Sequence, residues 1–286
     1  MASHKLFQIR LLSLLVILFY VLKINAQVNV IQDIDYREND QYNNNKDLLD
    51  IYMPEGAKKV PVLVYFHGGA LLKGTKKAGN EIGRKLAASG IGFISANYRL
   101  SPEFKHPDHV NDAAAATLWV LRNIADYGGD PSKVYVSGHS SGGYLAALLA
   151  VAPTFLKSND VLPKIKGGIL ISAFLYVEET AKDRIAINPI YKSIWGEDPL
   201  AWEKASVSSF LSPNKDNILL IYADGDAPWR KAQNQRFAKT LSDFGNQSII
   251  LEKVPNRDHG TLITKILSPD DRIVNLIKSF VLENKK

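Results

Sequence analysis

The sequence of 286 residues contains no cysteine. This absence excludes a disulfide framework, a thiolate nucleophile, a lipid-anchored cysteine and any zinc or iron–sulfur site built on thiolates. A nucleophile in this chain must therefore carry oxygen or nitrogen. With 46% hydrophobic and 22% charged residues the chain nevertheless has the composition of a folded globular protein.

The chain also has little excess charge once its first 26 residues are set aside. The remaining residues include 32 basic and 29 acidic side chains. A nucleic-acid-binding protein would show a basic stripe interleaved with aromatic residues, whereas the basic residues here are scattered. We predict no nucleic-acid partner, and we interpret the cluster of Lys73, Lys76 and Lys77 as a solvated loop.

The only long apolar run lies at the N-terminus. Residues 1–10 carry positive charge, 11–22 are apolar apart from Ser13, and 24–26 end in the small residue Ala26. This pattern predicts a signal peptide cleaved near Ala26, and the run is shorter than the roughly 20 residues that an uncleaved membrane anchor needs. We expect an exported protein, periplasmic or secreted, that begins at Gln27 and has no stable membrane anchor. An intact mass of the exported protein that includes the leader would contradict this prediction.

Beyond the leader, short apolar runs alternate with longer segments of helical periodicity. The predicted strands are 48–52, 62–66, 92–96, 134–137, 168–171, 218–222 and 248–254, and the predicted helices are 80–88, 110–127, 142–151, 231–244 and 272–282. This alternation indicates an α/β fold, in which helices cover both faces of a mostly parallel sheet. We predict a single domain over residues 27–286.

One segment, residues 173–213, interrupts the alternation of strand and helix. A connection of this length inside a compact domain is usually functional, so we expect a short lid-like insertion over a site. Its aromatic side chains suit either an apolar substrate or the packing of the lid itself. They are Phe174, Tyr176, Tyr191, Trp195, Trp202 and Phe210.

Residues 138–142, Gly-His-Ser-Ser-Gly, match the pattern G-x-S-x-G. In this motif a serine sits on a tight turn between a strand and a helix, where glycines relieve the crowding. The predicted strand before the turn and the predicted helix after it provide that setting. The motif predicts Ser140 as a nucleophile.

A serine nucleophile needs a histidine as its base, and α/β-hydrolases order the triad as Ser, acid, His. Only one histidine, His259, follows Ser140 in the sequence, and it lies in a polar loop after the last predicted strand. The acid should follow the preceding strand, where Asp224 and Asp226 compete. We favour Asp226, because it lies further from the strand end and can reach a histidine in an outer loop. Asp224 is also suited to a turn.

Acyl transfer develops a negative oxygen that backbone N–H groups can stabilise. A strand end followed by His67-Gly68-Gly69-Ala70 suits this role, because glycines let the main chain approach a ligand. We predict an oxyanion hole formed by Gly69, Ala70 and Ser141, with His67 stabilising the loop.

A second pair of histidines, His106 and His109, has a spacing compatible with a metal. No third ligand lies near them in the sequence, and Pro107 between them favours a helix start. We predict no metal.

With these residues in place, the chain resembles the α/β-hydrolase family, in its carboxylesterase and acetyl esterase branch related to hormone-sensitive lipase and to kynurenine formamidase. The resemblance extends from about Leu48 to the C-terminus. It rests on residues 67–69 (His-Gly-Gly), 97–103 (Asn-Tyr-Arg-Leu-Ser-Pro-Glu), 128–131 (Gly-Gly-Asp-Pro), the serine turn, and 258–260 (Asp-His-Gly).

The resemblance implies the α/β-hydrolase fold, the triad Ser140, Asp226 and His259, and catalysis without a cofactor. Two positions depart from the common pattern of the family. Ala70 replaces a third glycine found in many relatives, and Ser141 replaces a frequent alanine. Both keep the backbone N–H that the oxyanion hole needs.

We therefore expect a serine esterase that acts on small-molecule esters with short to medium acyl groups. Two alternatives stay open: an aryl formamidase with the same triad, and a non-catalytic hydrolase-like binding module. The sequence does not indicate an oligomeric state.

Overall fold

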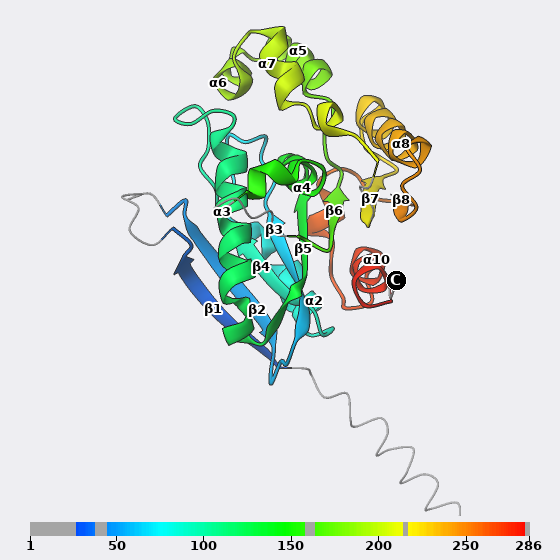
Figure 1. Cartoon of the computed structure of the whole chain (residues 1–286). Coiled ribbons are helices and arrows are strands. Elements are labelled where there is room, and N and C mark those ends of the chain that lie inside the picture. The colour runs from blue at the N-terminus through cyan, green and yellow to red at the C-terminus, as the bar shows by residue number, and fades with distance from the viewer. Residues whose placement is uncertain (1–26, 38–44, 158–163, 214–216, 284–286) are drawn as a thin grey trace, which may run out of the picture.

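The computed structural model describes residues 27–37, 45–157, 164–213 and 217–283, so the predicted leader lies outside the described residues. Eight strands form one sheet in the order β1-β2-β4-β3-β5-β6-β7-β8 (Figure 1). β2 is antiparallel to both β1 and β4, and all other neighbours are parallel. The strands are β1 (Val28–Asp35), β2 (Leu48–Pro54), β3 (Val60–Phe66), β4 (Gly92–Ala96), β5 (Gly129–His139), β6 (Gly167–Ile171), β7 (Ile218–Ala223) and β8 (Ile249–Val254).

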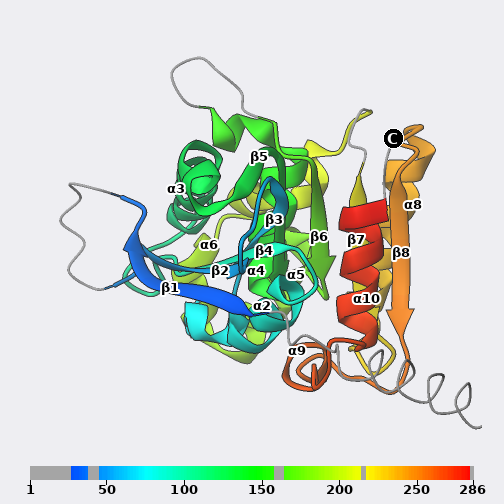
Figure 2. The same ribbon diagram turned by 90° about the horizontal axis from the view of Figure 1, so that it is seen from below.

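Helices cover both faces of this sheet, as the two views in Figures 1 and 2 show. One buried cluster joins the sheet to α3, α4 and α8, and a second joins its opposite face to α2 and α10. The α-helices are α2 (Asn80–Ala87), α3 (Asp108–Asn123), α4 (Ser141–Val151), α5 (Val177–Ile187), α6 (Lys192–Trp195), α7 (Pro199–Ala205), α8 (Pro228–Asp243), α9 (Thr261–Thr264) and α10 (Arg272–Lys278). Short 3-10 turns lie at Lys76–Gly79, Ile124–Tyr127, Pro153–Leu156, Pro189–Tyr191 and Val207–Phe210, and a π-helical turn, Ser279–Glu283, follows α10.

The central strands are apolar runs because both of their faces are buried. Every residue of β4, β6 and β7 is buried, which is what a parallel sheet between two helical layers requires. The predicted mostly parallel α/β architecture is confirmed. The edge strand β1 was not among the predicted strands, because half of its residues are polar and it contacts the sheet through one edge only.

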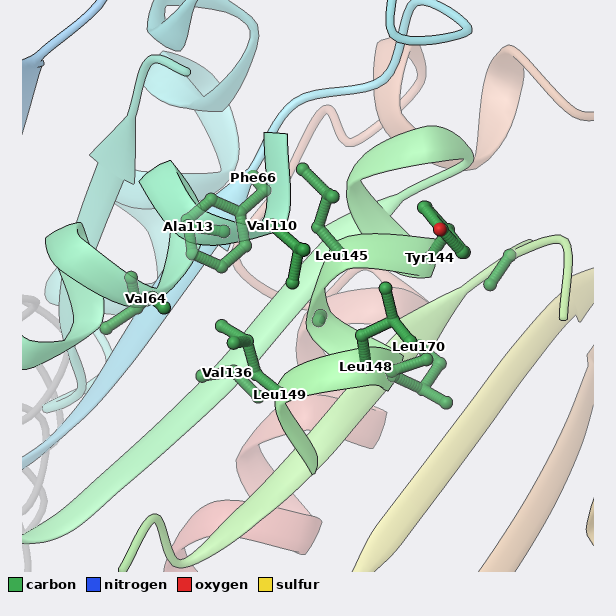
Figure 3. Close-up of a cluster of buried hydrophobic side chains, with 14 of the residues drawn as sticks. Val64, Phe66, Val110, Ala113, Val136, Tyr144, Leu145, Leu148, Leu149 and Leu170 are labelled. Atoms are coloured by element: carbon green, nitrogen blue, oxygen red, sulfur yellow. The ribbon is translucent and has the colours of Figure 1, made fainter. Parts of the chain in front are cut away.

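Helix α4 anchors the functional end of the sheet. Ten of its eleven residues are buried, because one side packs on β3, β5 and β6 and the other against α3 and the segment after β6. Figure 3 shows Leu145, Leu148 and Leu149 of this helix among Val64, Val136 and other side chains of the sheet and α3. The residue directly before α4, Ser140, is therefore held by a rigid element.

The interpretation of the lysine cluster as a solvated loop is wrong for one member. Lys73 and Lys77 are exposed, but the Lys76 side chain is only 7% exposed. Its ammonium contacts the fully buried carboxylate of Asp50 at 2.5 Å and that of Asp33 at 2.7 Å. The sequence alone could not predict this ion pair, because Asp50 lies 26 residues away from Lys76, in β2.

We expect Lys76→Met to lower the free energy of unfolding by roughly 3–5 kcal/mol, because it leaves the buried Asp50 carboxylate without its cation. Urea denaturation followed by circular dichroism measures this change. Lys77→Met, at the exposed neighbouring position, is the matched control and should change stability by less than about 0.5 kcal/mol. Equal effects of the two substitutions would contradict the buried ion pair.

Among the residues described, no helix combines the length and the apolar character needed to cross a membrane.

Candidate active site

Ser140 occupies the turn between β5 and α4 in a strained backbone conformation. Its φ of 57° and ψ of −116° lie outside the regions that L-residues usually adopt. The turn is possible because its neighbours are glycines: a Cβ on Gly142 would lie 1.9 Å from the Phe66 carbonyl oxygen, and one on Gly138 would lie 2.3 Å from the backbone of Gly142. This strained turn exposes the serine hydroxyl at the end of the strand, where other side chains can contact it.

His259 reaches this hydroxyl from the loop after β8. Its Nε2 lies 2.9 Å from Ser140 Oγ. His139 forms a hydrogen bond to the same loop: its Nε2–H donates to the His259 carbonyl oxygen at 2.8 Å. Burial, and then the neighbouring His259, lower the pKa of His139 to about 3. His139 is therefore neutral near pH 7 and serves as a hydrogen-bond donor rather than a base.

Asp226 completes the hydrogen-bonded chain. Its Oδ1 lies 3.0 Å from His259 Nδ1, and Asp226 is 3% exposed. Burial alone would raise the pKa of this carboxyl, but hydrogen bonds from His259, the Ala223 amide and Ser172 outweigh burial and hold the pKa below its ordinary value. A carboxylate that stays ionised fixes the Nδ1–H tautomer and leaves Nε2 free to accept a proton.

The structure separates the two aspartates that the sequence left in competition. Asp224 points away from the site: its side chain is 53% exposed and pairs with Lys253 at 3.2 Å. The turn at Gly225 brings Asp226 back over the sheet edge, where its Oδ2 accepts from the Ala223 N–H at 2.8 Å. Only Asp226 contacts His259.

Two residues that sequence reasoning missed also contact the carboxylate. Ser172, directly after β6, places its Oγ 2.8 Å from each Asp226 oxygen and 2.8 Å from His259 Nδ1. Arg230 of α8 has Nε 3.8 Å from Asp226 Oδ1, and its Nη1 donates to the Ser172 carbonyl at 2.7 Å. Burial lowers the pKa of Arg230 to about 10, against the opposing charge of Asp226, so it stays a cation at neutral pH. The only feature of the sequence that could have indicated a role for Ser172 is its position directly after a predicted strand.

Of the three predicted oxyanion-hole residues, Ser141 directly follows Ser140, and Ala70 lines the same cavity as Ser140. The backbone conformation here is tight, with a φ of 129° at Gly69 and 59° at Ala70. A Cβ on Gly69 would lie 1.9 Å from the Lys73 carbonyl oxygen, so glycine is required there. Within the described part of the chain, the N–H groups of Gly69, Ala70 and Ser141 donate no hydrogen bond. These three N–H groups are thus free to donate to a ligand.

The other histidines of the described residues, His67, His106 and His109, have structural partners. The buried His67 stacks on Tyr98 at 4.3 Å, and its Nδ1 lies 2.8 Å from the Gly68 carbonyl oxygen. Burial lowers its pKa to about 4, so it is neutral near pH 7. His106 contacts the Tyr144 hydroxyl at 3.2 Å, and His109 contacts Ser101 Oγ at 3.1 Å. No three His, Asp or Glu side chains of the described residues are grouped to hold a metal.

The segment after β6 folds into α5, α6 and α7, which lie together at one end of the molecule (Figure 1). Side chains of α5 and α6 and of Phe174 meet Ala70 and Ser140 around a small cavity of about 30 Å³. The lining residues are Ala70, Ser140, Phe174, Thr180, Arg184, Tyr191, Trp195 and Arg230. The segment 173–213 therefore contributes part of the wall around the serine, including three aromatic side chains, Phe174, Tyr191 and Trp195.

Comparison with known proteins finds similar sequences and similar folds. A family model named BD-FAE matches residues 49–167. A truncated carbohydrate esterase from gut microbiota superposes with a TM-score of 0.75 at 22% identity, covering 91% of this chain and 97% of that one. The chain has the α/β-hydrolase fold, and it is similar to esterases.

Two curated relatives define this relationship further. Esterase LipQ of Mycobacterium tuberculosis is 27% identical over 75% of this α/β-hydrolase, which spans 54% of the length of LipQ. Kynurenine formamidase of Salmo salar is 24% identical over 80% of the chain and 76% of its own length. The chain thus covers about half of one relative and three quarters of the other.

Proposed function

We propose that this α/β-hydrolase is a serine carboxylic-ester hydrolase in which Ser140, His259 and Asp226 form the catalytic triad. The observation that carries the proposal is the unbroken chain from Ser140 Oγ to His259 Nε2 at 2.9 Å and from His259 Nδ1 to Asp226 Oδ1 at 3.0 Å. The strained serine turn and the esterase relatives support the same chemistry.

The reaction follows from the positions of these atoms. His259 Nε2 takes the Ser140 proton while Oγ attacks the ester carbonyl carbon. The N–H groups of Gly69, Ala70 and Ser141 stabilise the oxyanion that forms. The tetrahedral intermediate then expels the alcohol, which receives the proton from His259. A water molecule, activated by the same histidine, hydrolyses the acyl-enzyme and releases the acid and free Ser140.

We infer short acyl groups as the preferred substrates, since the cavity beside Ser140 is small and walled by Phe174 and Trp195. Hydrolysis of p-nitrophenyl acetate and butyrate should exceed that of the octanoate ester by about tenfold or more in kcat/KM, because each additional methylene beyond the cavity must displace packed side chains. Equal or faster turnover of the octanoate ester would contradict the inference.

The formamidase relative supports a second candidate, hydrolysis of an N-formyl aryl amine by the same triad. Formyl is the smallest acyl group and fits the same cavity. Measuring N-formylaniline beside phenyl acetate separates the two functions: a larger kcat/KM for the formamide favours the formamidase. A wild-type protein that hydrolyses neither and does not react with a fluorophosphonate would be a binding module.

A further inference from the structure

Two arginines line the cavity that holds Ser140. Arg184 comes from α5 and Arg230 from α8, and both line the cavity. Both also stack on the same indole: the guanidinium carbons lie 5.8 Å and 4.5 Å from the Trp229 ring centre. Two cations on one side of a catalytic serine create a local positive field in a chain whose overall charge is modest.

The two guanidinium groups differ in what they contact. Arg230 is buried and engaged by Asp226 and the Ser172 carbonyl. Arg184 is half-buried, and within the described part of the chain it has no carboxylate partner. Its contacts are the Trp229 ring, the Tyr191 ring at 5.6 Å, and a long hydrogen bond of 3.5 Å to the Tyr191 hydroxyl.

Aromatic stacking orients a guanidinium without using up its in-plane N–H donors. The nearest acids on the same helix do not neutralise Arg184. Glu179 is paired with Arg236 at 2.5 Å and also accepts from Gln233. Asp183 is exposed on the groove wall and forms no ion pair with Arg184.

Arg184 also lines a second, larger groove. This groove, of about 780 Å³, runs between α5 and the start of α8 and shares Thr180 and Arg184 with the cavity. A volume of this size accommodates a small molecule, whereas the cavity itself holds only a short acyl group. Because Arg184 lines both spaces, an ester with its carbonyl at Ser140 and its acyl group in the cavity can place its alcohol part beside Arg184, on the side of the groove.

We propose that Arg184 binds a carboxylate on the alcohol part of the substrate. The enzyme then prefers short-chain esters of alcohols or phenols that carry a carboxylate group. The proposal rests on the proposed esterase function. It assigns Arg184 as a residue that determines specificity, with its planar N–H edge paired to the carboxylate.

The test compares an anionic ester, 4-acetoxybenzoate, with its neutral analogue, 4-acetoxybenzamide. In Arg184→Gln the ratio of the two kcat/KM values should fall about tenfold relative to wild type, which is the scale of one hydrogen-bonded charge contact near solvent. Comparing ratios removes the intrinsic difference in leaving-group reactivity. Arg184→Lys should restore part of the ratio, because lysine keeps the charge but not the planar pair.

Lys204→Gln is the matched control, since Lys204 is exposed on α7 and lines neither the groove nor the catalytic cavity. An equal loss on both esters in Arg184→Gln, or an equal change of the ratio in Lys204→Gln, would overturn the proposal. Binding of the product 4-hydroxybenzoate to Ser140→Ala gives a readout without catalysis. There, Arg184→Gln should raise the Kd about tenfold, and an unchanged Kd overturns the proposal even if the esterase function fails.

Discussion

Ser140→Ala is expected to lower kcat for p-nitrophenyl acetate by a factor on the order of a millionfold, the scale seen when a triad serine is removed. Alanine fits the turn without new contacts but cannot form the acyl-enzyme. His259→Ala should cost about as much, because the hydroxyl then has no base at 2.9 Å. The double variant should be little worse than either single one, since the two residues act as a unit.

The control is Ser132→Ala, which removes an exposed hydroxyl from the same strand β5. It should leave kcat within twofold of wild type, as ordinary surface substitutions do. Reaction with a fluorophosphonate, followed by mass spectrometry, should label wild type at Ser140 and fail to label Ser140→Ala. Full activity of Ser140→Ala would refute the triad. A fluorophosphonate adduct on another serine would identify that serine as the nucleophile.

Short-range patterns in the sequence predict much of this site. The strand–serine–helix turn is a local feature, set by glycines two positions either side of Ser140, and it is visible in five residues. The His67-Gly68-Gly69 turn is likewise local. His259 is found by elimination, because the order of the triad leaves one candidate. The α/β fold follows from the alternation of apolar runs and helical periods, and the structure confirms it.

Short-range patterns do not predict features that depend on contacts between elements distant in the sequence. The choice between Asp224 and Asp226 depends on the turn at Gly225, which points one carboxylate outward to Lys253 and the other inward to His259. The ion pair of Lys76 with Asp50 depends on the pairing of β2 with the sheet. Ser172 has no motif, and only the packing of β6 beside β7 brings it to Asp226.

Ser172 is therefore the residue at which we expect the largest effect outside the triad. Its hydroxyl bridges both Asp226 oxygens and His259 Nδ1 at 2.8 Å, so it fixes the angle at which the carboxylate meets the imidazole. Its backbone has a φ of 49°, a conformation that costs a non-glycine residue of order 1–3 kcal/mol. Such a cost is tolerated where the surrounding structure requires the side chain in one place.

Ser172→Ala removes the hydroxyl and keeps the strained backbone, whereas Ser172→Gly removes the hydroxyl and relieves the strain. If the hydroxyl positions Asp226, both variants should lose kcat by about 10- to 100-fold with little change in KM, because misplacement of a catalytic group by about 1 Å has this cost. Thermal unfolding should separate the variants, with Ser172→Gly at least as stable as Ser172→Ala. Loss of activity in only one of them would assign the effect to the backbone rather than to the hydroxyl. Positioning by the hydroxyl requires equal loss of kcat at unequal stability, a combination that a merely structural role of Ser172 does not produce.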